Sequence, residues 1–130
     1  MKGILLLLLI GGIVQIKAQQ LFNCYHVQEF VWNPNTNLYD TPIERADQSK
    51  FKIDKENKTL TQIFEDDNST STSIKSYSYD EVKSVSTLAV ISPSNGYTYT
   101  YRINSKSHII EVSFSNSGKE TILKKYLYKD

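Results

Sequence analysis

The chain has 130 residues, with 15 lysine and arginine residues against 14 aspartate and glutamate residues, a formal net charge of +1 and one cysteine. A charge this close to zero argues against the broad basic surface that binds nucleic acid or anionic lipid. A single cysteine excludes an intramolecular disulfide, so core packing and strand pairing must stabilise the fold. The length is that of one domain.

The first 18 residues are typical of a secretory signal peptide. A positive residue, Lys2, precedes an apolar run over residues 4–10, and Ala18 is a small residue at a suitable cleavage point. A transmembrane helix needs about 20 apolar residues, and this run is shorter. We therefore expect a signal peptide helix at residues 1–18 and a secreted or periplasmic domain over residues 19–130, with an uncleaved anchor as the alternative.

The first segment after the signal peptide, residues 22–32, is rich in aromatic and β-branched residues and predicts a strand. A cluster of asparagines around Pro34 ends it. In the next segment, residues 41–47, Thr41 suits a helix cap and Pro42 suits a first helical position. This segment predicts either one or two turns of helix or an ordered loop.

From residue 50 onward, apolar and polar residues alternate with the period of two that is typical of strands. The strongest turn signal is the stretch from Pro93 to Gly96, because Asn-Gly readily adopts the positive φ values of tight hairpins. About eight strands in an antiparallel meander result, so the fold class is predicted to be all-β, either an up-and-down barrel or a strongly twisted sheet. The later strands are expected at residues 50–54, 59–65, 73–79, 82–92, 97–104, 108–114 and 121–128.

Tyrosines are the main candidates for ligand binding. Within residues 97–104 three of them, with Ile103, occupy alternate positions and share one face of the strand, while Arg102 lies on the opposite face and is expected in solvent. A tyrosine offers an apolar ring and a hydroxyl, which suits sugars, lipid head groups or a partner protein. Ordinary cross-strand packing, at roughly 0.2–1 kcal/mol per pair, is the alternative. The candidates are Trp32, Tyr77, Tyr79, Tyr97, Tyr99 and Tyr101.

Catalytic and metal-binding signatures are missing from the sequence. It contains no H-E-x-x-H, no G-x-S-x-G, no P-loop and no pair of C-x-x-C motifs. His26 and His108 would be neighbours in a closed sheet, but no third ligand follows at a recognisable spacing, and His108 is expected as a hydrogen-bonded residue at the edge of the core. We therefore expect a protein that is not an enzyme and has no catalytic residues, no metal and no cofactor.

Three further features have two interpretations each. The acidic group around Asp66 offers oxygen ligands, but it lacks the closing acid and glycine of an EF-hand, so a solvated hairpin tip is expected rather than a calcium site. Asn57 and Asn68 begin N-glycosylation sequons in predicted turns and would be modified only in a eukaryotic secretory pathway. Cys24 is expected to be a buried apolar side chain, with an intermolecular disulfide or a reactive thiol as the alternative.

The end of the signal peptide at Ala18, the Trp32 segment and the Phe51-Lys52-Ile53-Asp54 strand resemble small exported β-proteins of Bacteroidota, which are lipocalin-like or calycin-like in outline. The chain is also similar to periplasmic lysozyme inhibitors in size and strand content, although one cysteine cannot form their disulfide. Lipocalins carry Gly-x-Trp near the first strand, whereas Phe30-Val31-Trp32 lacks the glycine. The resemblance therefore implies a barrel outline without implying ligand transport.

We predict a non-catalytic, exported β-domain that binds a macromolecule or an envelope component, and a lipocalin-like carrier of a small apolar or sugar ligand is the alternative. The expected partners are a protein, an envelope component or a small apolar ligand, with no nucleic acid and no membrane span after signal cleavage. A closed barrel with an apolar cavity of roughly 300 Å³ or more, reachable from solvent, would favour the carrier, and a filled interior or a flat tyrosine face would count against it.

Overall fold

The computed structural model describes residues 19–116 and 118–129, so the predicted signal peptide lies outside the described residues. All the regular elements in these ranges are β-strands. Among the same residues, no helix has the length and apolar character needed to cross a membrane.

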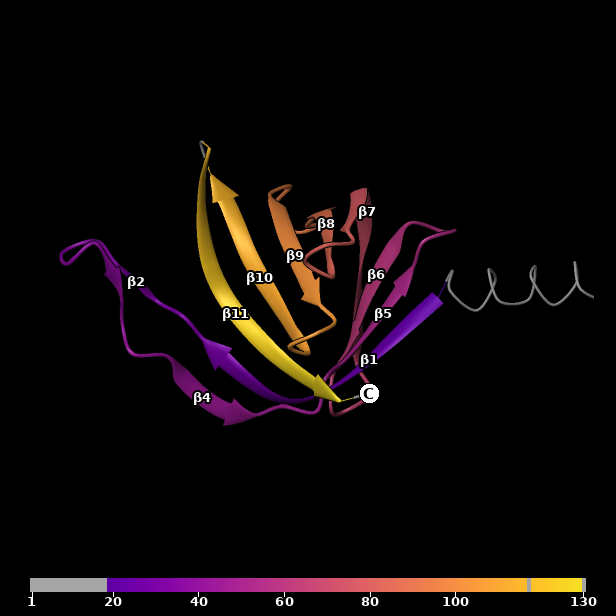
Figure 1. Ribbon diagram of the computed structural model, residues 1–130, viewed down its shortest axis with the longest axis horizontal. Coiled ribbons are helices and arrows are strands. Elements are labelled where there is room, and N and C mark those ends of the chain that lie inside the picture. The colour runs from indigo at the N-terminus through magenta and orange to yellow at the C-terminus, as the bar shows by residue number, and fades with distance from the viewer. Residues whose placement is uncertain (1–18, 117, 130) are drawn as a thin grey trace, which may run out of the picture.

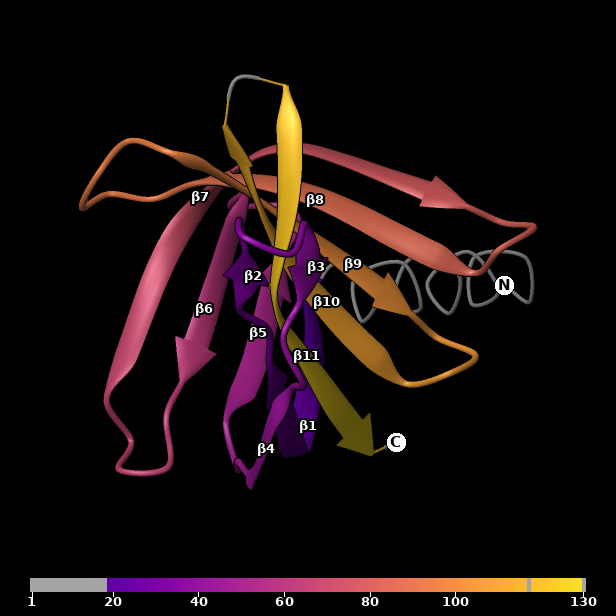
Figure 2. The same ribbon diagram turned by 90° about the vertical axis from the view of Figure 1, so that its left-hand side faces the viewer.

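Eight strands close into an antiparallel barrel, which confirms the all-β class and selects the barrel over the twisted open sheet. Each strand pairs with the next around the barrel, and the last pairs back with the first (Figures 1 and 2). The barrel strands are β1 (Gln19–Glu29), β5 (Lys50–Asp54), β6 (Thr59–Ile63), β7 (Ser69–Asp80), β8 (Val85–Ile91), β9 (Thr98–Asn104), β10 (Ile109–Asn116) and β11 (Lys119–Lys129).

A two-stranded ribbon extends from the barrel between β1 and β5. It consists of the end of β1, β2 (Trp32–Asn33), β3 (Leu38–Tyr39) and β4 (Ile43–Ala46), and Figure 1 shows it projecting to one side of the other strands. Its base is held against β11, because the amide of Phe30 donates to the carbonyl of Leu123 over 2.9 Å and the amide of Ile122 donates to the hydroxyl of Tyr39 over 2.9 Å.

The short helix considered for residues 41–47 is wrong, because four of these residues form β4. Residue Ala46 pairs with His26 and Ile43 pairs with Glu29, so the backbone groups that a helix would satisfy internally are satisfied by β1 instead. Local capping signals were present, but the extended hydrogen-bonding edge of β1 determines the conformation.

Side chains fill one end of the barrel interior and leave the other end hollow. We call the filled end the closed end; it carries the turns at residues 55–58, 81–84 and 105–108. We call the hollow end the open end; it carries the loops at residues 64–68 and 92–97. At the closed end the Tyr128 ring lies 5.0 Å from Phe22 and 5.1 Å from His108, between ring centroids. The buried hydrophobic residues are Cys24, Val27, Phe51, Ile53, Leu60, Ile74, Leu88, Val90, Ile103, Ile110, Val112, Tyr126 and Tyr128.

Candidate functional site

The open end of the barrel contains a cavity of about 210 Å³, which we call the barrel hollow. The cavity is lined by residues of strands β6 to β11 and of the loop that follows β8. They reach it because alternate side chains of each strand point inward. The register continues around the wall: Val90 lies opposite Tyr99, Tyr101 opposite Val112, and Val112 opposite Lys124. The lining residues are Gln62, Thr72, Val90, Ser92, Tyr99, Tyr101, Val112, Leu123, Lys124 and Tyr126.

An aromatic cluster underlies the barrel hollow. The ring of Phe51, which is only 1% exposed, lies 4.9 Å from the ring of Tyr126 and 6.0 Å from that of Tyr101, both in edge-to-face geometry. Such pairs stabilise beyond their buried area by about 0.5–1.5 kcal/mol. The three rings therefore fix the positions of two tyrosine hydroxyls at the hollow.

The hydroxyls of these tyrosines remain able to donate hydrogen bonds. The Nε2 of Gln62 donates to the hydroxyl of Tyr126 over 3.3 Å and to Oγ of Ser49 over 3.4 Å, so Tyr126 acts as an acceptor there and keeps its own proton free. Among the described residues the hydroxyl of Tyr101 has no hydrogen-bond partner. The hydroxyls of Tyr101 and Tyr126 are thus available as O–H donors in the barrel hollow.

Both hydroxyls stay neutral over the physiological pH range. Burial raises the pKa of Tyr101 to about 12, and the nearby phenols Tyr126 and Tyr99 contribute in the same direction. Burial also raises the pKa of Tyr126 to about 12, against a smaller opposite effect of its hydrogen bond from Gln62. A neutral phenol can donate a hydrogen bond to an acceptor ligand, whereas a phenolate would repel an anion.

Two cations near the open end, Arg45 and Lys124, have different surroundings. The Nη2 and Nε of Arg45 donate to Oε1 of Glu29 over 2.6 and 3.0 Å, and its Nη1 lies 3.5 Å from the carboxylate of Asp47. The bonds from Arg45, with a weaker contribution from the charge of Lys124, hold the pKa of Glu29 below its usual range. Within the described residues, the ammonium of Lys124 forms neither a hydrogen bond nor an ion pair.

Of the predicted ligand-binding residues, the structure brings Tyr99 and Tyr101 into the barrel hollow. Tyr97 lies just before β9, exposed, with its ring 5.3 Å from Phe114. Arg102, on the same strand, forms an ion pair with Glu120.

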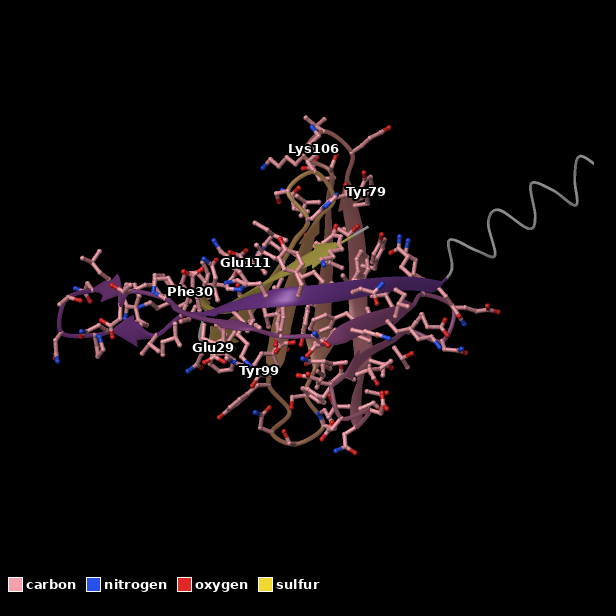
Figure 3. All side chains as sticks on the ribbon, turned by 90° about the horizontal axis from the view of Figure 1, so that it is seen from below. Glu29, Phe30, Tyr79, Tyr99, Lys106 and Glu111 are labelled. Atoms are coloured by element: carbon pink, nitrogen blue, oxygen red, sulfur yellow. The ribbon has the colours of Figure 1, made fainter. Side chains whose placement is uncertain are left out.

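The other three predicted residues lie elsewhere. Tyr77 and Tyr79 are exposed on β7 toward the closed end, and Figure 3 shows Tyr79 and Tyr99 on opposite sides of β1. Trp32 belongs to the ribbon, where its ring lies 5.0 Å from Tyr39 and under the ammonium of Lys119.

Sequence reasoning missed the polar members of the lining, above all Gln62, Lys124 and Tyr126. A signal was present in β11, where Lys124, Tyr126 and Tyr128 occupy alternate positions and so share a face. A lysine on the same face as two tyrosines indicates an interior that is partly polar. The pattern alone does not say which face of the strand is interior.

The two histidines lie on different parts of the barrel wall. Nε2 of His26 lies 3.2 Å from Oε1 of Glu44 on the ribbon, while His108 stacks on Tyr128 at the closed end. Strand β11 separates them, since it pairs with β1 on one side and with β10 on the other. In the part of the chain that the structure describes, no group of three or more His, Cys, Asp or Glu side chains is placed to hold a metal ion.

The remaining candidates occupy simple environments. Asp66 accepts bonds from the amide and the side chain of Asn68, at 3.1 and 2.8 Å, within an exposed loop. Asn57 is also exposed in a turn, and its side chain donates to Asp54 over 2.8 Å. The thiol of Cys24 is buried, and burial, with a smaller effect of the Asp47 charge, raises its pKa to about 12. A protonated buried thiol is a poor nucleophile.

Comparisons with protein-family models, curated proteins and solved structures found no match to this chain. The functional argument therefore depends on the geometry of the barrel hollow.

Proposed function

We propose that the protein is a non-catalytic binding protein that holds one small molecule in the barrel hollow. The observation that carries this proposal is a cavity of about 210 Å³ inside a closed barrel, lined by available hydroxyl donors over an aromatic floor. The volume falls short of the roughly 300 Å³ that would favour a carrier of a drug-sized ligand, so the hollow suits only a smaller molecule. Polar groups on the wall favour a hydrophilic ligand over a purely apolar one.

A lipocalin-like, exported carrier is the setting that fits this proposal. The sequence supplies a signal-peptide pattern at residues 1–18, and the barrel supplies an interior open at one end. Among the described residues, the lining combines one lysine with neutral polar and apolar side chains, a composition that suits holding a ligand.

The test uses two serines that hydrogen-bond to each other over 2.9 Å, Ser92 in the lining and Ser94 outside it. The purified protein is incubated with a small-molecule extract of its host and analysed by native mass spectrometry. We expect Ser92→Trp to fill the hollow and abolish the ligand adduct, and Ser94→Trp, which breaks the same bond, to retain it. Equal adducts in both variants, or none in the unmodified protein, would contradict the proposal.

Binding of a macromolecule is the second candidate, and the ribbon favours it. Val31, Leu38 and Ile43 are all exposed there, beside the paired backbone of β2 and β3. Clustered exposed apolar side chains are typical of interaction surfaces. Changing all three to serine is expected to reduce retention of a partner protein or envelope component from host extract while leaving small-molecule binding intact; unchanged retention would exclude the ribbon as the contact.

A further inference from the structure

We infer that the ligand of the barrel hollow is a small carboxylate, with Lys124 as its counter-ion and the hydroxyls of Tyr101 and Tyr126 as hydrogen-bond donors. This inference rests on the proposed function and narrows it to one chemical class. It depends on the inward position of Lys124, on the lack of a direct hydrogen bond or ion pair to its ammonium among the described residues, and on the donors that line the same cavity.

The inward position of Lys124 follows from strand register. Lys124 lies opposite Val112, and both line the barrel hollow together with Tyr126, two residues along β11. The adjacent Lys125 belongs to the other face, where its ammonium lies 5.3 Å from the centre of the Phe30 ring. Two neighbouring lysines thus have different surroundings, and only Lys124 faces the hollow.

Glu29 is the cross-strand neighbour of Lys124 and interacts with its charge, but the Glu29 carboxylate is hydrogen-bonded to Arg45. Arg45 is bonded to Glu29 and lies close to Asp47, so both carboxylates on this side have a cationic partner already. The further acids Glu65 and Asp66 line a separate groove of about 730 Å³ and are not part of the lining of the hollow. Lys124 is therefore a cation of the lining that makes no direct ion pair within the described residues, so it can bind an anionic ligand.

A carboxylate matches this set of groups better than a neutral molecule does. It only accepts hydrogen bonds, while an ammonium only donates them, and the hydroxyls of Tyr101 and Tyr126 have protons to give. Charge-assisted bonds of this kind are about twice as strong as neutral ones. A neutral sugar would satisfy the hydroxyls but leave a partly desolvated ammonium without a counter-ion.

The rest of the lining limits the size and shape of the acid. Val90, Val112 and Leu123 provide apolar contacts around the hollow, and a volume of about 210 Å³ admits a single ring or a short chain. One unpaired cation matches one negative charge, which favours a monocarboxylate over phosphate. Benzoate therefore serves as the probe, with benzamide as its neutral counterpart and inorganic phosphate as the other anion.

The experiment measures binding of the three probes by NMR chemical-shift titration at neutral pH, up to about 10 mM, where millimolar Kd values are visible. We expect benzoate to bind at least about tenfold more tightly than benzamide or phosphate, with shifts at Tyr101 and Tyr126. Lys124→Met should weaken the affinity for benzoate about tenfold and leave the affinity for benzamide unchanged. Lys125→Met is the matched control, because it removes the same charge from the same strand on the outer face.

Three results would overturn the inference. These are equal affinity for benzoate and benzamide, an equal effect of Lys124→Met and Lys125→Met, or no binding of benzoate across the concentration range. The ligand adduct in the native mass spectrum separates this inference from the proposed function. If the adduct is a neutral molecule and Ser92→Trp abolishes it, the carboxylate inference is wrong but the proposed binding function stands. If Ser92→Trp leaves the adduct unchanged, both the inference and the proposed function are wrong.

Discussion

The two ends of the barrel interior use the same residue type in opposite ways. At the closed end Tyr128 is fully engaged: its hydroxyl donates to the carbonyl of Asn104 over 3.2 Å, and its ring packs on Phe22 and His108. At the open end Tyr101 packs its ring on Phe51, but its hydroxyl has no partner among the described residues. A buried tyrosine is therefore structural at one end and available to a ligand at the other.

Irregular strands produce this difference. Bulges interrupt the register after Cys24 in β1, after Ile74 in β7 and opposite Val112 in β11, and a bulge bends a strand and increases its twist. Beyond the first bulge β1 stays paired with β11 but exchanges β5 for β4 as its other neighbour, so β1 and β5 separate there.

The largest predicted effect comes from Phe51, which separates the two ends. We expect Phe51→Ala to lower the free energy of unfolding by about 3–5 kcal/mol, because it creates a cavity under Tyr101 and Tyr126. Urea denaturation measures it. Phe64→Ala is the control: Phe64 is 38% exposed in a loop, and its loss should cost far less. Phe51→Leu keeps the fold for binding experiments and should enlarge the hollow.

Equal costs for Phe51→Ala and Phe64→Ala would mean that Phe51 does not separate a packed end from a hollow one. The comparison between the ends would then fail, and with it the assignment of Tyr101 and Tyr126 to a rigid binding site.

The next largest predicted effect is a loss of stability at alkaline pH, which measures how strongly the interior disfavours the ionised forms of its buried thiol and phenol groups. The folded pKa of Cys24 is raised from 9.0 to about 12, so the folded state favours the neutral thiol. The contribution of the neutral thiol to the free energy of unfolding is fully present below pH 9. It is lost at about 1.4 kcal/mol per pH unit as the pH rises from 9 toward 12. Burial of Tyr101 and Tyr126, with pKa values raised from 10.0 to about 12, adds to the loss above pH 10.

The measurement is the free energy of unfolding in urea at intervals between pH 8 and pH 11. Cys24→Ala should remove the decline between pH 9 and pH 10 and leave the steeper part above pH 10. A decline of the same slope in this variant would assign the effect to a group other than Cys24.

Much of the fold was predictable because it depends on local alternation. The strand over residues 97–104 and the Asn-Gly turn before it are encoded in neighbouring residues, and the structure confirms them as β9 and its preceding loop. Segment 41–47 was not predictable in this way, since β4 forms only because β1 offers it a partner.

The candidate site was predictable only in part, for a related reason. Period-two alternation shows that Tyr99 and Tyr101 point together, but the identity of the interior face depends on how the barrel closes. Lys124 illustrates the limit. A lysine is expected at the surface by its chemistry, and only the register opposite Val112 reveals that it faces the hollow.

The smallest predicted change in stability tests the comparison of the two ends directly. Tyr128→Phe should lower the free energy of unfolding by about 0.5–1.5 kcal/mol, because the bond to Asn104 is lost. Tyr101→Phe should leave it within about 0.5 kcal/mol or raise it slightly, since an unpartnered hydroxyl is removed. Benzoate binding should respond in the opposite order, weakening severalfold in Tyr101→Phe and staying within about twofold in Tyr128→Phe.

Urea denaturation and NMR titration of the same two variants separate a packing role from a binding role at each tyrosine. If Tyr101→Phe destabilised the fold as much as Tyr128→Phe did, the Tyr101 hydroxyl would be a structural group like its counterpart. If both variants bound benzoate normally, the Tyr101 hydroxyl would have no role in binding the ligand. Loss of binding in Tyr101→Phe with stability retained is the one outcome that a purely structural tyrosine cannot give, because removing an unpartnered hydroxyl leaves the packing of the ring unchanged.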